Sequence, residues 1–123
     1  FPVFDFSVYK ELENNKRQIL NGDFDVFGDG SVMILDAPGH TPGHQVLLLR
    51  LKNYGPLLLS GDLYHFVKSR ELNAIPTFNI DAVQTLESME KIERIIASEK
   101  ATLWIEHNLA LAKTLNLAPA FYD

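Results

Sequence analysis

Residues 32–51 read VMILDAPGHTPGHQVLLLRL, in which two apolar stretches flank a loop of unusual composition. The stretches Val32–Leu35 and Gln45–Leu51 have the length and the composition of β-strands. Between them, residues 38–44 contain two prolines, two glycines and two histidines. This segment is predicted to be a stiff loop that holds an imidazole at a fixed angle, because Pro and Gly interrupt regular structure. We expect Gln45–Leu51, which is largely apolar, to be buried on both faces of its sheet.

The segments on either side of this stretch predict further strands. Short apolar runs bounded by Gly, Asn and Pro are typical of strands, and Gly28-Asp29-Gly30 is typical of a hairpin turn. The predicted strands are Phe24–Phe27, Ser31–Asp36, Gln45–Leu51, Leu57–Ser60 and Thr102–Ile105.

Apolar residues three or four positions apart predict two helices. The clearer one covers Ala82–Ser98 and is capped by Asp81, and the other covers Ser7–Leu20. A short helical turn is predicted over Leu109–Leu115. The long mixed stretch Leu63–Ile80 is predicted to be irregular, and loops of that length in a compact domain are usually functional or flexible.

Composition narrows the classes of function. The chain has 123 residues, 46% of them hydrophobic and none of them cysteine, which suits one globular domain without disulfides or thiolate metal sites. A net charge of −5 argues against nucleic-acid binding, which needs a basic face. The apolar runs are too short to span a membrane. Phe1–Phe4 resembles neither a signal peptide nor a usual start, and we expect a cytoplasmic protein whose sequence continues upstream.

Three residues that can bind metal ions follow three different strands. His40, Asp62 and His107 each lie just past the C-terminal end of an apolar strand. Neighbouring parallel strands would bring these ends to one edge, where such sheets gather their functional loops. Imidazole and carboxylate are ligands of Zn²⁺ and similar ions. Taken singly, each residue has a plainer interpretation, because a lone His is usually a hydrogen-bonded residue and an Asp after a Gly is often a turn residue.

The order of these segments resembles the C-terminal half of the metallo-β-lactamase superfamily, and most of all its N-acyl homoserine lactonase-like hydrolases. The likeness covers nearly the whole chain and is carried by Asp25–Val32, Pro38–His44, Ser60–Phe66, Ile75–Asn79 and Trp104–His107. The resemblance implies an α+β fold. In that fold, this chain would supply one half of a four-layer αββα sandwich, namely a sheet with its covering helices.

The resemblance also implies a role for each polar residue. His40 and His107 would each bind one of two metal ions, and Asp62 would bridge them. Zn²⁺ is the expected ion, with Fe, Mn or Co as alternatives. His44 would orient its loop without binding metal. The ions would hold a bridging hydroxide that attacks the substrate, so the implied function is a metal-dependent hydrolase of an ester-like carbonyl, in particular of a lactone.

The chain departs from the family pattern in one large respect. The remaining family ligands come from an upstream His-x-His-x-Asp-His motif, and no His precedes His40. We therefore expect residues 1–123 to be the C-terminal part of a single longer domain, and to be inactive alone. A sheet that normally faces another sheet should expose a large apolar face, so we expect dimerisation or contact with the missing N-terminal half.

A second departure is local. The lactonases have a Tyr three residues after the bridging Asp, where it can help to polarise the lactone, whereas here that position is His65 and the Tyr is Tyr64. We expect Asp62, Tyr64 and His65 to be catalytic residues at a cleft for a small-molecule substrate. Two alternatives stay open: a glyoxalase II-like thioesterase, which shares the ligand loop, and a non-catalytic interaction fragment of the same fold.

Overall fold

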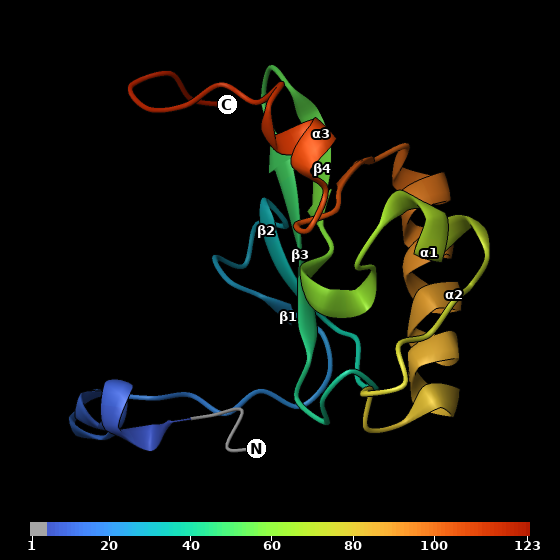
Figure 1. The fold of residues 1–123 in the computed structure, drawn as a ribbon. Helices are drawn as coiled ribbons and strands as arrows, with labels where there is room; N and C mark the ends of the chain where they lie inside the picture. The colour runs from blue at the N-terminus through green and yellow to red at the C-terminus, as the bar shows by residue number, and fades with distance from the viewer. Residues whose placement is uncertain (1–4) are drawn as a thin grey trace.

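Within residues 5–123, which the computed structural model describes, a five-stranded sheet is covered by a long helix (Figure 1). The strands lie side by side in chain order. They are β1 (Phe24–Asp25), β2 (Val32–Asp36), β3 (Gln45–Leu51), β4 (Gly55–Leu59) and β5 (Thr102–Trp104). The first three pairs are antiparallel, whereas β4 and β5 are parallel. Each predicted strand is therefore confirmed, with small shifts at the ends.

The direction of the strands decides where the loops meet. β3 lies between β2 and β4 and runs antiparallel to both, so β2 and β4 point the same way. β5 is parallel to β4. The C-terminal ends of β2, β4 and β5 therefore lie at the same edge of the sheet. We expected the three strands that precede His40, Asp62 and His107 to be parallel neighbours, but only β4 and β5 are paired in that way, and β2 is separated from β4 by the antiparallel β3.

Helix α2 (Ala82–Glu99) covers one face of the sheet. It begins as predicted at Asp81, whose side chain accepts a hydrogen bond from the Gln84 backbone N–H. Its inner side presents Met89 and Ile92, which pack into the core with the buried leucines of β3 and β4. Full burial of such a side chain stabilises a fold by about 1.5–3 kcal/mol, so α2 and the sheet hold one another in place.

The opposite face of the sheet is half buried, which corrects the prediction that β3 is buried on both faces. Cross-strand partners on this side form a row of apolar residues across all five strands: Phe24, Ile34, Leu47, Leu59 and Trp104. Each of them is partly exposed. Because α2 lies against the other face, this apolar row keeps part of its surface in water.

The predicted helix over Ser7–Leu20 is wrong. The segment contains two short 3₁₀ helices, η1 (Phe6–Val8) and η2 (Lys10–Asn14), and no helix follows in residues 15–20. The cap also differs, because Ser7 donates its N–H to the side chain of Asp5. The segment extends away from the sheet (Figure 1), and its apolar residues other than Leu20 are exposed. A helix of this length is marginal without a packing partner, which explains the difference.

Residues 61–80 lead from the sheet to α2 through loops and two short helices, η3 (Gly61–Leu63) and α1 (Val67–Glu71). The predicted irregular stretch is thus confirmed in the main. Helix α3 (Leu109–Ala112) is a shortened form of the predicted helical turn, and the side chain of Asn108 caps it. Among the described residues, none of the helices has the length and hydropathy needed to cross a membrane.

Candidate metal centre

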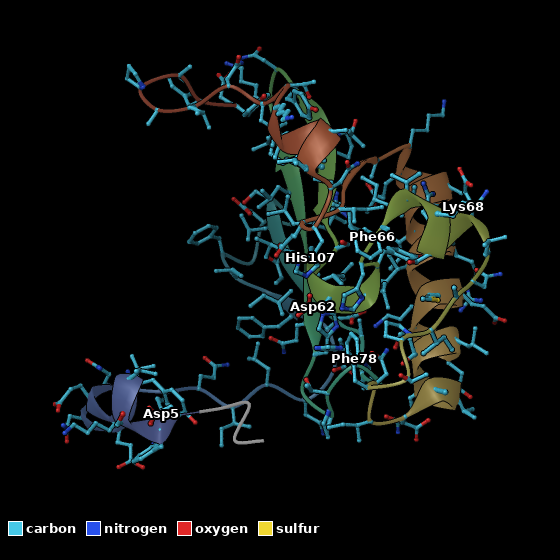
Figure 2. All side chains as sticks on the ribbon, viewed as in Figure 1. Asp5, Asp62, Phe66, Lys68, Phe78 and His107 are labelled. Carbon is cyan, nitrogen blue, oxygen red and sulfur yellow. The ribbon has the colours of Figure 1, made fainter. Side chains whose placement is uncertain are left out.

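Three loops at the shared edge of the sheet bring their polar residues together. His40 lies in the loop after β2, Asp62 lies in η3 after β4, and His107 follows β5. His107 Nε2 is 2.6 Å from Asp62 Oδ1, and His40 Nε2 is 3.4 Å from Asp62 Oδ2. Figure 2 shows Asp62 and His107 next to one another beside the sheet. The fold thus brings together the three residues that the sequence singled out as metal ligands.

A fourth side chain, His65, joins them. Its Nε2 lies 3.9 Å from Asp62 Oδ1, and its ring stacks on that of His107 with centroids 5.2 Å apart. One potential ligand atom from each of Asp62, His65 and His107 lies within 4.8 Å of the other two. We call the group of His40, Asp62, His65 and His107 the Asp–His cluster.

His44 takes a different position beside the cluster. Its Nδ1–H donates to the backbone carbonyl of Ala37 at 2.9 Å, and its Nε2 accepts the backbone N–H of Asp62 at 3.0 Å. Both ring nitrogens are therefore used, and no lone pair is left for a metal ion. His44 ties the loop after β2 to η3, which matches the orienting position that the resemblance implied.

Tyr64 points away from the cluster, which corrects the expectation that it faces the substrate. Its side chain is buried, and its hydroxyl donates to Glu93 on α2 at 2.8 Å. Arg70 binds the same carboxylate through two hydrogen bonds of 2.6 and 2.7 Å. The backbone at Tyr64 is extended, and successive side chains of extended backbone point to opposite sides. Turning Tyr64 into the core therefore turns His65 toward Asp62.

The ionisation of the cluster suits metal binding. Partial burial opposes ionisation of Asp62, but the hydrogen bond from His107 and the positive charge of nearby imidazoles outweigh it, so the pKa of Asp62 lies below its usual value. Burial lowers the pKa of His65 and also that of His44. At neutral pH the site therefore combines a carboxylate with the neutral imidazole of His65, and these are the forms that bind metal ions.

The donor set of the cluster fits a transition-metal ion. Imidazole nitrogens and a carboxylate are the ligands that Zn²⁺ and its neighbours prefer. In addition, His65 Nδ1 is buried and has no hydrogen-bond partner among the described residues. Such nitrogens are rare in folded proteins. The other ring nitrogen, Nε2, is the one that faces Asp62, at 3.9 Å and so beyond hydrogen-bond distance.

An apolar hollow of about 420 Å³ opens beside the cluster. Its lining includes His65, Phe66, Ile75 and Phe78. The Phe78 ring packs edge-on against His65, with centroids 5.3 Å apart, and against His40, with centroids 6.0 Å apart. Phe78 therefore borders the hollow and also contacts two imidazoles of the cluster. Figure 2 labels it near Asp62.

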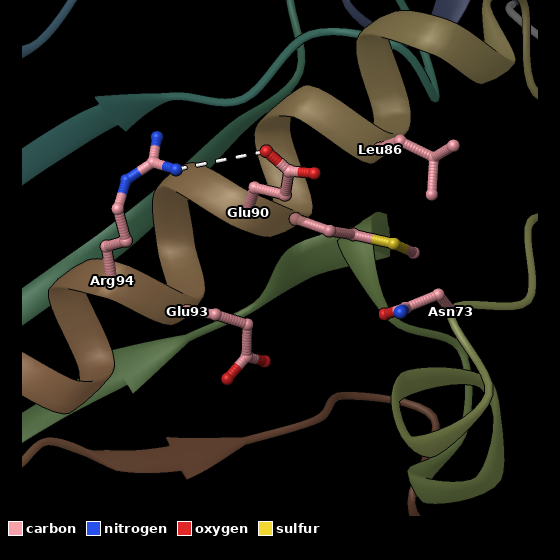
Figure 3. A pocket seen from close by; sticks show the side chains of 6 residues that line it. Asn73, Leu86, Glu90, Glu93 and Arg94 are labelled. Carbon is pink, nitrogen blue, oxygen red and sulfur yellow. Dashed lines mark ion pairs between the residues drawn. The ribbon is translucent and has the colours of Figure 1, made fainter.

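A different hollow, of about 340 Å³, lies along α2 (Figure 3). Its lining includes Asn73, Leu86 and Glu93, together with Glu90 and Arg94, which form an ion pair. No member of the Asp–His cluster lines it. We therefore assign it no part in the metal centre.

Asn79 is the residue near the cluster to which the sequence assigned no role. Its Oδ1 lies 3.1 Å from His40 Nδ1. In the sequence, Asn79 stands in a stretch that we noted only as part of the family resemblance, just before the helix cap Asp81. An Asn in such a place is typical of a loop, and no local pattern indicates a partner in the loop after β2.

Comparison with known proteins now gives this geometry a context. No protein-family model matched the chain. Over 111 residues, covering 87% of the chain, it is 38% identical to the N-acyl homoserine lactonase AttM of Rhizobium radiobacter. It is also 30% identical over 110 residues to an N-acyl homoserine lactonase of a Bacillus species. The homologues of the chain are thus N-acyl homoserine lactonases, and the match is consistent with the C-terminal half of such an enzyme. The chain spans 42% and 43% of the length of these two relatives.

Solved structures show the same relationship. The chain superposes with a TM-score of 0.76 and 27% identity on an N-acyl homoserine lactone hydrolase that has the product N-hexanoyl-L-homoserine bound at its catalytic metal centre. The match covers 86% of this chain and 41% of that one. A quorum-quenching N-acyl homoserine lactone hydrolase matches equally well. The predicted fold class, one α+β half of the metallo-β-lactamase fold, is therefore confirmed.

Proposed function

We propose that this chain supplies part of the metal site of a hydrolase that opens lactones. The Asp–His cluster carries the proposal, because His40, His65 and His107 surround the Asp62 carboxylate at one edge of the sheet. Support comes from the relatives, which are named as N-acyl homoserine lactonases. On this view the scissile bond is an ester-like carbonyl–oxygen bond.

His40, Asp62 and His107 would hold the metal. The two oxygens of Asp62 face different imidazoles, since Oδ1 faces His107 and His65 while Oδ2 faces His40. A carboxylate with one oxygen toward each side suits a bridge between two ions. Zn²⁺ is the ion that we expect for these donors, with Fe, Mn or Co as alternatives. Such ions, when bound, would polarise the substrate carbonyl and would make a hydroxide nucleophile available at neutral pH.

The residues of the chain itself position the site and exclude water. His44 holds the backbone of Asp62, and His65, rather than the buried Tyr64, is the side chain that faces the space beside it. The apolar hollow next to Phe78 suits the hydrocarbon part of a substrate and keeps water away from one side of the cluster. We infer a small lactone with an apolar acyl substituent as the substrate class.

We further propose that residues 1–123 form the C-terminal part of one longer domain and are inactive alone. The chain spans less than half the length of its relatives, and within it the ligands come from a single edge of one sheet. The partly exposed apolar row on the far face of that sheet suits contact with a second sheet from the missing half. A second copy of the chain would cover the same row as a dimer.

Measuring metal content and lactone hydrolysis together tests the proposal. The longest natural form of the protein should bind about two equivalents of Zn²⁺ and hydrolyse N-hexanoyl homoserine lactone. Asp62→Asn removes the charge at nearly constant shape, so it should weaken metal binding by at least about 100-fold and abolish hydrolysis. Asp29→Asn, in the exposed turn between β1 and β2, is the matched control and should change neither.

Other outcomes decide against the proposal. Hydrolysis of thioesters in preference to lactones would support the glyoxalase II-like alternative. A well-folded full-length protein that binds no metal would support a non-catalytic interaction role. Activity of residues 1–123 alone at enzyme-like rates would refute the claim that the ligand set is completed from outside them.

A further inference from the structure

A network of three hydrogen bonds ends at Nδ1 of His40, on the side of the ring that faces away from Asp62. Thr85 Oγ1 lies 2.6 Å from the backbone carbonyl oxygen of Asp81, at the start of α2. Asn79 Nδ2 lies 3.1 Å from Thr85 Oγ1, and Asn79 Oδ1 lies 3.1 Å from His40 Nδ1. These hydrogen bonds therefore link the start of α2 to the His40 ring through two side chains.

The direction of each hydrogen bond follows from the Asp81 carbonyl oxygen, at which the network starts. A carbonyl oxygen only accepts, so the Thr85 hydroxyl donates its one proton to Asp81. Thr85 Oγ1 must then accept from Asn79, which places the amide NH₂ toward Thr85 and the amide oxygen toward His40. Because an amide oxygen also only accepts, the proton of a neutral His40 ring is on Nδ1. Its Nε2 keeps the lone pair, on the side of Asp62.

The surrounding contacts prevent this hydrogen-bond network from rearranging easily. Thr85 is fully buried. The backbone N–H of Ile80 donates to the His40 carbonyl oxygen, and that of Asp81 donates to the Gly39 carbonyl oxygen. The backbone that carries Asn79 is thus bonded directly to the backbone that carries His40. Rotation of the imidazole or of the amide would break a bond at a site where the main chain cannot follow.

We propose that Asn79, held by Thr85, is a positioning residue that keeps His40 in the Nδ1–H tautomer and so leaves Nε2 free for a metal ion. The inference rests on the proposed metal site and deepens it. His44 is fixed through its Nδ1 by a backbone carbonyl, which no substitution removes. His40 instead depends on a side-chain amide, and outer partners of this kind typically contribute 10- to 100-fold to metal affinity.

The tautomer can be observed without any variant. Long-range ¹H–¹⁵N correlation spectra of the metal-free full-length protein at pH 8, above the ordinary histidine pKa of about 6.5, distinguish protonated from unprotonated ring nitrogens. We expect His40 Nδ1 to be protonated and Nε2 to be unprotonated. The opposite tautomer, or a mixture of the two, would overturn the inference.

Variants then test the consequence for metal binding. Asn79→Ala removes the acceptor, so the two His40 tautomers should mix and the Kd for Zn²⁺, measured against a competing chelator, should rise about 10- to 100-fold. Asn79→Asp keeps an oxygen that accepts from Nδ1–H but cannot donate to Thr85, so it should restore the tautomer and bind Zn²⁺ more tightly than Asn79→Ala does. Asn116→Ala, in the C-terminal tail, is the matched control and should change neither quantity.

Two results separate this inference from the proposed function. A wild-type protein that binds no Zn²⁺ refutes the metal site itself, whatever the tautomer. A protein that binds Zn²⁺ with the same Kd in Asn79→Ala and Asn116→Ala refutes the role of Asn79 and leaves the metal site standing. Urea unfolding of each variant shows that the comparison is made on folded protein, and the wild-type spectrum decides the tautomer even if Asn79→Ala does not fold.

Discussion

Replacing Tyr64 by Phe tests how the loop that carries the Asp–His cluster is held in place. The substitution removes the hydroxyl that donates to Glu93 at 2.8 Å and keeps the ring in the core. Tyr64 lies between Leu63, which is buried, and His65, which faces Asp62. The hydroxyl therefore links the loop that carries Asp62 and His65 to α2.

The loss of stability expected for Tyr64→Phe depends on how exposed the Glu93 carboxylate is. A hydrogen bond to a charged group contributes about 1.5–3 kcal/mol, but the Glu93 side chain is 39% exposed, so water can replace part of the lost bond. Arg70 also keeps both of its bonds to the carboxylate. We expect Tyr64→Phe to lower the free energy of unfolding by about 1–2 kcal/mol. Glu93→Ala leaves a buried hydroxyl without a partner and should cost about 2–4 kcal/mol.

Urea unfolding followed by circular dichroism measures both changes. Tyr9→Phe, in the partly exposed N-terminal segment, is the matched control and should lie within about 0.5 kcal/mol of wild type. The double variant of Tyr64 and Glu93 should cost little more than Glu93→Ala alone, because both changes remove the same bond. A Tyr64→Phe protein as stable as wild type, or effects that simply add, would refute the reasoning.

Two further predictions concern alkaline pH and the approach of the His40 loop to α2. Burial, followed by the bond to Glu93, raises the pKa of Tyr64 above its ordinary value of about 10. The unfolded chain then loses the phenolic proton first, so the free energy of unfolding should fall above about pH 10, by up to about 1.4 kcal/mol per pH unit; an equal slope for Tyr64→Phe would contradict this. Gly39 has φ +130°, and a Cβ there would overlap the Thr85 backbone, so Gly39→Ala should cost about 2–5 kcal/mol in urea unfolding. Gly28→Ala also has positive φ but meets no neighbour, and equal costs for the two would show that the contact is unimportant.

Much of the fold could be predicted because the signals are local. Gly28 and its neighbours mark a hairpin, Asp81 marks the start of α2, and apolar runs of strand length mark the sheet. The prediction of a helix over Ser7–Leu20 is wrong because such a helix depends on packing contacts that a local pattern does not reveal. Its apolar periodicity is present, but within residues 5–123 most of its apolar side chains are exposed, and isolated short helices are marginal in water.

The residue types at the three strand ends can be read from the sequence, and they predict that His40, Asp62 and His107 meet if the strands point the same way. Which neighbours join these three residues depends on how the chain packs in three dimensions. The packing of Tyr64 against α2 turns His65 toward Asp62, and the start of α2 brings Asn79 to His40. These contacts depend on where a helix far along the chain settles on the sheet, because side-chain direction in a loop follows from what its neighbours bury rather than from any local pattern.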